Sequence, residues 1–437
     1  MTSAVLGLYL LFLLLGLILI GYPVAFVLLG VAAIAGFIDS GFLTFDLMIR
    51  SLERTMRQEL LAAIPLFILM GTVLERAGLM TRLMHAFQLL FAKLNGSLYL
   101  AVISTSTVFS MATGIVGASV TVIGMLAGKD MVKQSYDVRL SAGAIAAGGT
   151  LGILIPPSIM LITLGPILNV PVLQLFGAVI GPGILLAVMF LSYCLLRCWL
   201  NPSLGPALHE KTDTIPIRDI AYQLLTGAMP LSAVIVATLG SILTGLATPT
   251  EASAVGATSA ILLAVGYRRL SFADLQHALR TTLKISSMVL LLISFANYLG
   301  SVFASLGTPR LISSWLLNLG LDPLILVAII LVLIFIMGWA LDWAPIVLVF
   351  VPVVLPVITE AGINPLWFGA LVAVCLQTAW LTPPVALSAY FLKSVMQEWS
   401  LKDIYLGMAQ FLVIQLIGLA LVFAFPWIAL TIPNTLR

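Results

Sequence analysis

The sequence predicts an all-α polytopic membrane protein built from two inverted structural repeats, with two re-entrant hairpins and two broken helices. Three observations lead to this fold class. The composition is extremely apolar, the two halves of the chain correspond, and a pair of adjacent prolines recurs at the same place in each half. Of the 437 residues, 61% are hydrophobic and only 8% are charged, a balance that suits a bilayer and not water.

Long uncharged runs set the number of membrane crossings. A spanning helix needs about 20 apolar residues, so the runs leave room for roughly ten to twelve crossings. The first run, residues 4–20, lacks a basic segment before it and a small-residue cleavage site, which favours a retained helix over a removed signal peptide. Lysine and arginine lie in short loops, as membrane orientation requires, and form no stripe for a nucleic acid.

The two halves match at a nearly constant offset. Pro23 in GYPVAF corresponds to Pro249 in ATPTEA, an offset of 226 residues. Pro156-Pro157 in LGILIPPSIML corresponds to Pro383-Pro384 in TAWLTPPVALS, an offset of 227. The expected division is a first membrane repeat over 1–199, a polar connecting loop over 200–222 and a second membrane repeat over 223–437.

The segment 98–126 decides whether the repeats are parallel or inverted. Gly114 and Gly117 lie near its centre among serines and threonines, so it fits either one tilted helix or two half-helices folded back as a re-entrant hairpin. A hairpin adds no net crossing and leaves about five spans between the matching prolines, which gives inverted repeats; a single span gives parallel ones. The expected hairpins are about 98–126 and 323–358, and the expected broken helices about 140–166 and 366–393.

The proline pairs carry most of the functional argument. Two adjacent prolines remove two backbone donors and break a helix, which leaves carbonyls near Ile155 and Thr382 without partners. Such carbonyls persist at membrane depth only where protein, water or a cation satisfies them. A proline kink satisfied by neighbouring helices is the alternative, but recurrence in both halves favours a sodium or substrate site in an alternating-access transporter.

The hairpins place polar groups opposite these breaks. The first offers Thr113, Gly114 and Ser119, whose oxygens suit a hard cation. In the second, FIMGWALDWAPIVL, the central positions are Gly338 and Asp342, and a carboxylate in a long uncharged stretch indicates a cation ligand or a proton carrier. The alternative for Asp342 is a helix-end aspartate near the membrane interface, where the flanking tryptophans would be anchors.

Other polar features have structural explanations. Thr248 as N-cap, Pro249 at the first helical position and Glu251 at the third predict a capping box. The segments 42–60 and 270–286 have one apolar and one charged face, so we expect amphipathic helices along the membrane surface. The three cysteines are expected to pack in the core.

The sequence argues against an enzyme. It has no GxxxxGK[ST] phosphate loop, no HExxH or CxxC motif, and no buried nucleophile and base pair, so we expect neither catalysis nor a cofactor. The functions that compete with a coupled transporter are an uncoupled channel, an accessory membrane subunit and an intramembrane enzyme.

Four motifs occur in order along the chain: PLFILMG from Pro65, GGTLGILIPPS from Gly148, ATPTEASAVGA from Ala247 and LTPPVA from Leu381. Together they resemble the large membrane subunit, DctM type, of tripartite ATP-independent periplasmic (TRAP) transporters, over essentially the whole chain. The resemblance implies a fold of the elevator-type ion transporter superfamily, in which hairpins and broken helices move against a scaffold. It also implies a Na+-coupled symporter in the bacterial or archaeal cytoplasmic (inner) membrane.

The same resemblance implies partners and ligands. The partners are a small four-helix membrane subunit and a periplasmic substrate-binding protein; the solute is a small organic acid such as a carboxylate, dicarboxylate or 2-oxo acid. Membrane lipid surrounds the chain, and no nucleic acid is involved. Where many relatives have Ser-Gly-Ser, this chain has Thr113-Gly114-Ile115, which removes one side-chain oxygen. The implied Na+ ligands are Thr113, Gly114, Thr150 and Ser158 in a first site, and Gly338, Asp342, Thr378 and Thr382 in a second.

Overall fold

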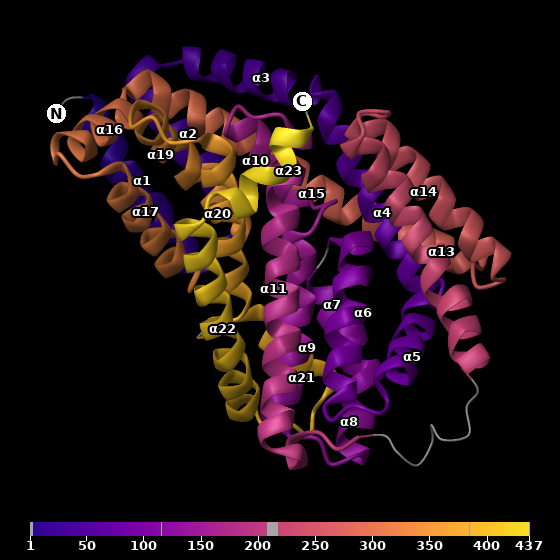
Figure 1. Ribbon diagram of the computed structural model, residues 1–437. Coiled ribbons are helices and arrows are strands. Elements are labelled where there is room, and N and C mark those ends of the chain that lie inside the picture. The colour runs from indigo at the N-terminus through magenta and orange to yellow at the C-terminus, as the bar shows by residue number, and fades with distance from the viewer. Residues whose placement is uncertain (1–2, 115, 208–216, 384, 437) are drawn as a thin grey trace.

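The chain folds into a bundle of helices. The computed structural model describes residues 3–114, 116–207, 217–383 and 385–436. Within these ranges all regular secondary structure is helical, and no strand occurs. In Figure 1 the long helix α11 (Val172–Leu200) stands upright near the centre, while α3 (Leu43–Met56) lies across one end of the upright helices.

The first half of the chain changes direction mainly at glycines and prolines. Gly78 and Gly114 have positive φ angles of 68° and 61° and lie directly before and after helices. The remaining elements of this half are α1 (Ser3–Leu19), α2 (Val24–Ser40), η1 (Glu59–Ala62), α4 (Ala63–Arg76), α5 (Leu79–Phe91), α6 (Ser97–Thr113), α7 (Val116–Ile123), the π-helical η2 (Gly124–Gly128), α8 (Lys129–Lys133), α9 (Val138–Leu154), α10 (Ile159–Ile167) and η3 (Pro202–Leu204).

The second half has a similar succession of long and short helices. Its elements are α13 (Ile217–Leu243), α14 (Pro249–Gly266), α15 (Phe272–Leu306), α16 (Thr308–Asn318), α17 (Pro323–Met337), α18 (Trp343–Pro345), the π-helical η4 (Ile346–Phe350), α19 (Val351–Glu360), α20 (Pro365–Gln377), η5 (Thr378–Trp380), α21 (Leu387–Val395), α22 (Leu401–Ala424) and α23 (Trp427–Thr435).

Helices α9 and α20 form the centre of the bundle. Every residue of α9 from Leu140 onward is buried, and so is every residue of α20 from Trp367 onward. A helix that is covered all round belongs to a core and not to a lipid-facing surface. Small residues allow close approach here: a Cβ on Gly143 would lie 2.5 Å from the Gly407 carbonyl oxygen of α22.

Fewer helices are long enough to cross a bilayer than the apolar runs suggested. Among the described residues, four helices meet a spanning length and hydropathy, or six if two bent pairs each count as one span. Several shorter apolar helices of 10–17 residues accompany them. The difference from roughly ten to twelve arises because glycines and prolines divide many apolar runs into shorter helices.

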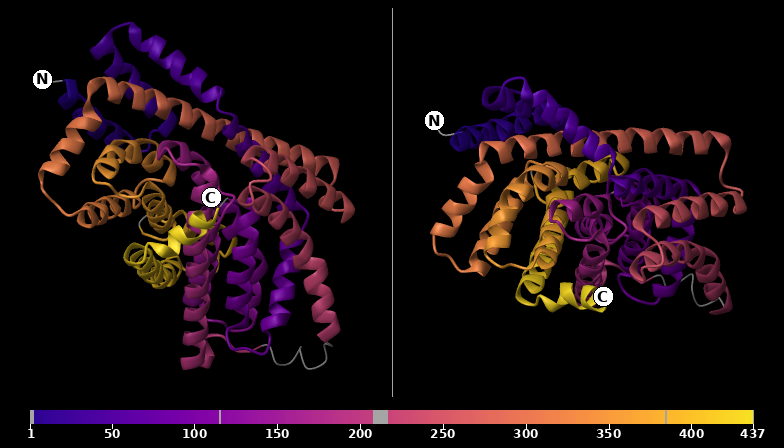
Figure 2. Two further views of the ribbon diagram at one scale, coloured as in Figure 1. Left: turned by 45° about the horizontal axis from the view of Figure 1, so that its top comes forward. Right: turned by 90° about the horizontal axis from the view of Figure 1, so that it is seen from above.

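The expected amphipathic segments differ from the structure in one respect. The segment 270–286 is not a separate helix, because α15 continues from Phe272 to Leu306 over 35 residues without an internal proline. Helix α3, by contrast, is separate and bends by 61° into the following helical segment. Figure 2 shows α15 running along the molecule with α3 near one of its ends.

Hydrogen bonds hold α3 against α15. The Thr44 and Tyr298 hydroxyls lie 2.5 Å apart, and the Ser51 and Ser301 hydroxyls 3.2 Å apart. The Asn297 amide nitrogen also donates to the Thr55 hydroxyl at 2.9 Å. These buried or partly buried bonds make the two helices one unit.

Three further expectations can be compared with the structure. The connecting loop is shorter than 200–222, because the backbone of α13 is already helical at Ile217. The capping box is confirmed: the Thr248 hydroxyl accepts from the Glu251 amide at 3.3 Å, and Glu251 accepts from the Thr248 amide at 2.8 Å. The three cysteines are buried and free, as predicted.

Candidate functional site

The first proline pair separates two helices. Helix α9 ends at Leu154, Ile155 and Ser158 are extended, and α10 begins at Ile159 with a 43° change of direction. The peptide bond between Pro156 and Pro157 is cis. The chain therefore leaves the helical conformation where the sequence predicts it.

One carbonyl at this break is satisfied by a side chain. In a helix the Ile153 carbonyl would accept from the third or fourth following residue, but both are prolines and have no N–H. The Ser158 hydroxyl donates to this carbonyl at 2.6 Å instead. Ser158 is thus a structural part of the break, and its oxygen keeps lone pairs that could face a cation.

The turn between α6 and α7 touches the same break. A Cβ on Gly114 would lie 3.3 Å from the Pro157 carbonyl oxygen and 3.8 Å from the Ser158 Cα. Together with the positive φ of 61°, this close approach explains a glycine here. Ser119 is buried in α7. The side chain of Thr113 and all of Ile115 lie outside the described residues.

The second break has a different form. Helix α20 ends at Gln377, and η5 makes one tight turn before the chain leaves the helix at Leu381. The amides of Leu381 and Thr382 both donate to the Thr378 carbonyl, at 2.9 and 3.0 Å. Helix α21 begins only at Leu387, and Pro384 lies outside the described residues.

The turn after α17 approaches this second break. A Cβ on Gly338 would lie 3.1 Å from the Cβ of Ala379 in η5. Four residues later, Asp342 is the N-cap of α18, and its carboxylate accepts from the Trp343 amide at 2.7 Å. The Asp342 side chain is exposed, so its carboxylate has room for a further ligand.

The four candidate hydroxyl groups that the structure describes share one feature. Each hydroxyl donates its proton to the backbone carbonyl of a residue three to five positions earlier in the chain. None therefore has a proton free for another acceptor. What each offers to a neighbouring group is oxygen lone pairs, which suit a cation, although Thr150 uses one of its two to accept from the Gln377 amide nitrogen. The bonds are Thr150 to Ala147 at 2.7 Å, Ser158 to Ile153 at 2.6 Å, Thr378 to Cys375 at 2.5 Å and Thr382 to Thr378 at 2.7 Å.

The structure thus brings Gly114 to the first break and Gly338 to the second. It also joins the two central helices through a residue that the sequence argument did not assign to the site: the Gln377 amide nitrogen donates to the Thr150 hydroxyl at 2.9 Å. The two residues are 227 positions apart, which is the offset of the proline pairs. Because Gln377 occupies the position in the second half that Thr150 occupies in the first, a comparison of the two halves could have identified it.

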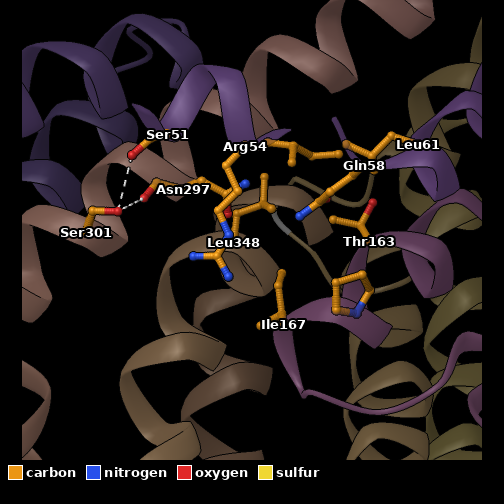
Figure 3. A pocket seen from close by; sticks show the side chains of 11 residues that line it. Ser51, Arg54, Gln58, Leu61, Thr163, Ile167, Asn297, Ser301 and Leu348 are labelled. Carbon is orange, nitrogen blue, oxygen red and sulfur yellow. Dashed lines mark hydrogen bonds between the residues drawn. The ribbon is translucent and has the colours of Figure 1, made fainter. Parts of the chain in front are cut away.

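A separate cavity of about 160 Å³ lies between α3, α15, α10 and η4. Figure 3 shows the Arg54 side chain of α3 extending into the space in front of Leu348, with Asn297 to one side and Thr163 to the other. No ion pair of Arg54 is found among the described residues. A guanidinium in such a setting can bind a carboxylate in two-point geometry.

Two solved structures share this fold. The Alcanivorax borkumensis YdaH transporter aligns with a TM-score of 0.67 at 16% identity, and the alignment covers 99% of each chain. MtrF of Neisseria gonorrhoeae aligns with a TM-score of 0.59 at 13% identity, over 89% of this chain and 85% of that one. At these identities the similarity concerns the fold alone.

Sequence relatives are more informative. The C4-dicarboxylate TRAP transporter large permease protein DctM of Rhodobacter capsulatus is 29% identical over 97% of this chain and 98% of its own length. The 2,3-diketo-L-gulonate TRAP transporter large permease protein YiaN of Escherichia coli is 31% identical, over 85% and 86%. The sialic acid TRAP transporter large permease protein SiaM of Vibrio cholerae is 29% identical, over 96% of each.

The family model described as "Tripartite ATP-independent periplasmic transporter, DctM component" matches residues 11–428. Members of this family are multi-pass membrane permeases of transporters and not enzymes. Since the match covers nearly the whole helical bundle, the chain belongs to the DctM component family of tripartite ATP-independent periplasmic transporters.

Proposed function

We propose that this chain is the permease subunit of a secondary active, Na+-coupled, ATP-independent uptake system for a small organic acid. The observation that carries the proposal is the pair of helix breaks, each approached by a turn between helices. The described hydroxyls at the breaks offer lone pairs and no free protons. Oxygen ligands and open carbonyls at broken helices are how transporters of this architecture bind Na+.

In this proposal each break holds one Na+. The first site would use Thr113, Gly114, Thr150 and Ser158. The second would use Gly338, Asp342, Thr378 and Thr382. Asp342 would supply the negative charge that the first site lacks.

The proposed movement is that of an elevator, in which the two hairpins and broken helices slide as one unit. The internal packing supports a repeated architecture: α6 packs against α9 as α17 packs against α20, and α7 packs against α21 as η4 packs against α10. Each hairpin thus contacts the broken helices of both halves. The α3–α15 unit would belong to the scaffold.

The proposed solute is an organic acid. The relatives' names specify a C4-dicarboxylate, 2,3-diketo-L-gulonate and sialic acid, each of which carries a carboxylate. The cavity that Arg54 borders would receive such a group, since it lies between the proposed scaffold and the proposed moving unit. The soluble partner would deliver the acid and set most of the specificity.

The proposed setting is the bacterial or archaeal inner membrane. There the chain would work with a small four-helix membrane subunit and a periplasmic binding protein, as TRAP large permeases do. Membrane lipid would cover the apolar side chains exposed on the outer helices, for example Phe12, Phe26 and Leu262.

Uptake by reconstituted proteoliposomes tests the coupling. With both membrane subunits in the bilayer and the loaded binding protein outside, an inward Na+ gradient should drive accumulation of the labelled acid. Replacing Na+ by choline at constant ionic strength should abolish accumulation, and ATP should have no effect. Uptake that reaches equilibrium without Na+ would instead indicate an uncoupled channel.

A further inference from the structure

Gln377 lies where the two central helices meet. It is the last residue of α20, is fully buried, and directly precedes the tight turn η5. Its amide nitrogen donates to Thr150 of α9 at 2.9 Å. A buried polar bond between equivalent positions of the two halves indicates a role that apolar packing could not fill.

The chemistry of Thr150 fixes the orientation of the Gln377 amide. A threonine hydroxyl has a single proton, and that of Thr150 is donated to the Ala147 carbonyl at 2.7 Å. The hydroxyl oxygen can therefore only accept from Gln377, so the NH2 group must face Thr150. The amide oxygen Oε1 then faces elsewhere; it is buried and has no hydrogen-bond partner among the described residues.

A second acceptor lies in the turn that follows. The Trp380 carbonyl cannot form a helical bond, because the third and fourth following residues are Pro383 and Pro384. At the first break the equivalent Ile153 carbonyl is satisfied by Ser158, but the position equivalent to Ser158 is Val385, which has no hydroxyl. Trp380 follows Gln377 by one 3₁₀ turn, so its carbonyl lies one turn beyond Gln377 in the same interruption of the helix.

We propose that Oε1 of Gln377 and the carbonyl of Trp380 are ligands of the cation bound at the second break. This inference rests on the proposed Na+ coupling and adds two ligands that the motif comparison does not assign. A neutral amide oxygen is a normal ligand for a hard cation. The bond to Thr150 holds the oxygen in place, so the ligand is preorganised only when both central helices are in register.

An unpartnered oxygen alone would not suffice for this assignment. Gln415 of α22 is also buried and also has an unpartnered Oε1. Its amide nitrogen, however, donates to the Val374 carbonyl within uninterrupted α20, away from the proline pair. Gln415 is therefore the matched control for Gln377.

The test uses Na+ alone as the probe. The full-length permease, in complex with its small membrane subunit in nanodiscs, is titrated with NaCl against choline chloride while the melting temperature is followed. We expect Na+ to raise the melting temperature of the wild type and of Q415L with the same midpoint. In Q377L the Na+ concentration at the midpoint of this rise in melting temperature should be at least about tenfold higher. A change of that size is expected when a cation loses roughly one good ligand.

A second variant, Q377E, tests the same ligand if Q377L does not fold. Q377E retains an oxygen and adds a charge when it ionises, so its apparent Na+ affinity should rise more steeply with pH than that of the wild type. Unchanged Na+ midpoints in Q377L, or a wild-type pH profile in Q377E, would overturn the assignment while leaving the proposed coupling intact. A wild type that shows no Na+ response would overturn both.

Discussion

Asp342 has two roles that a single substitution can separate. Its carboxylate caps α18 through the Trp343 amide, and its charge is the only one in the second proposed site. Asparagine caps helices about as well as aspartate but is neutral. D342N should therefore preserve the fold and remove only the electrostatic contribution.

We expect D342N to lower the apparent Na+ affinity of uptake by about tenfold or more, since about 1.4 kcal/mol in binding corresponds to a tenfold change. Initial uptake rates as a function of Na+ concentration would measure it. D322N is the control, because Asp322 caps α17 at the other end of the same hairpin by accepting from Leu324 at 2.8 Å. Wild-type Na+ dependence in D342N would remove Asp342 from the coupling.

The candidate residues also show where sequence reasoning is limited. Motif positions identify the candidate hydroxyl residues, but the sequence does not show that each hydroxyl donates to a backbone carbonyl earlier in the chain. The Gln377–Thr150 bond was likewise hidden, because it depends on how two distant helices cross. A comparison of the two halves position by position would have paired the residues without predicting contact.

Among the helices, the close contact of α9 with α22 depends on paired glycines. A Cβ on Gly407 would lie only 2.0 Å from the Arg139 carbonyl oxygen, a backbone atom that cannot rotate away. G407A should push the two helices apart and cost on the order of 1–3 kcal/mol, as overpacking does in tight cores. We expect a lower melting temperature and reduced uptake.

G30A is the matched control for this prediction. Gly30 is also inside a helix, but a Cβ there would meet nothing within 4 Å. Alanine favours the helix over glycine, so G30A should leave the melting temperature unchanged or raise it slightly. Equal melting temperatures for G407A and the wild type would show that the two helices can separate at little cost.

The sequence predicted interruptions of helices better than their lengths. Proline lacks an N–H wherever it occurs, so the ends of α9 and α20 follow from local covalent chemistry. The 35-residue length of α15 did not follow, because its amphipathic first part and its apolar second part looked like different elements. In the structure the two parts form one helix that packs against α2, α3 and α4, contacts that the local sequence pattern does not contain.

At the scale of the whole molecule, the proposed elevator movement requires a moving unit and a scaffold that meet at the cavity near Arg54. Ile293 of α15 and Leu348 of η4 both line this cavity and are buried, and the proposal assigns them to the scaffold and to the moving unit respectively. Ser51 and Ser301 also line it, but they belong to α3 and α15, which hydrogen bonds hold together. The two pairs therefore distinguish motion between the moving unit and the scaffold from motion within the scaffold.

In a background in which the three native cysteines are replaced, the pair I293C/L348C should transport until a bifunctional thiol reagent links it. Linking should then stop uptake, because η4 could no longer move relative to α15. The pair S51C/S301C, linked by the same reagent, should transport at the rate of its unlinked form, since the 3.2 Å contact between these positions is expected to persist through the cycle. Full uptake by linked I293C/L348C would show that η4 and α15 move together and would place the boundary of the moving unit elsewhere.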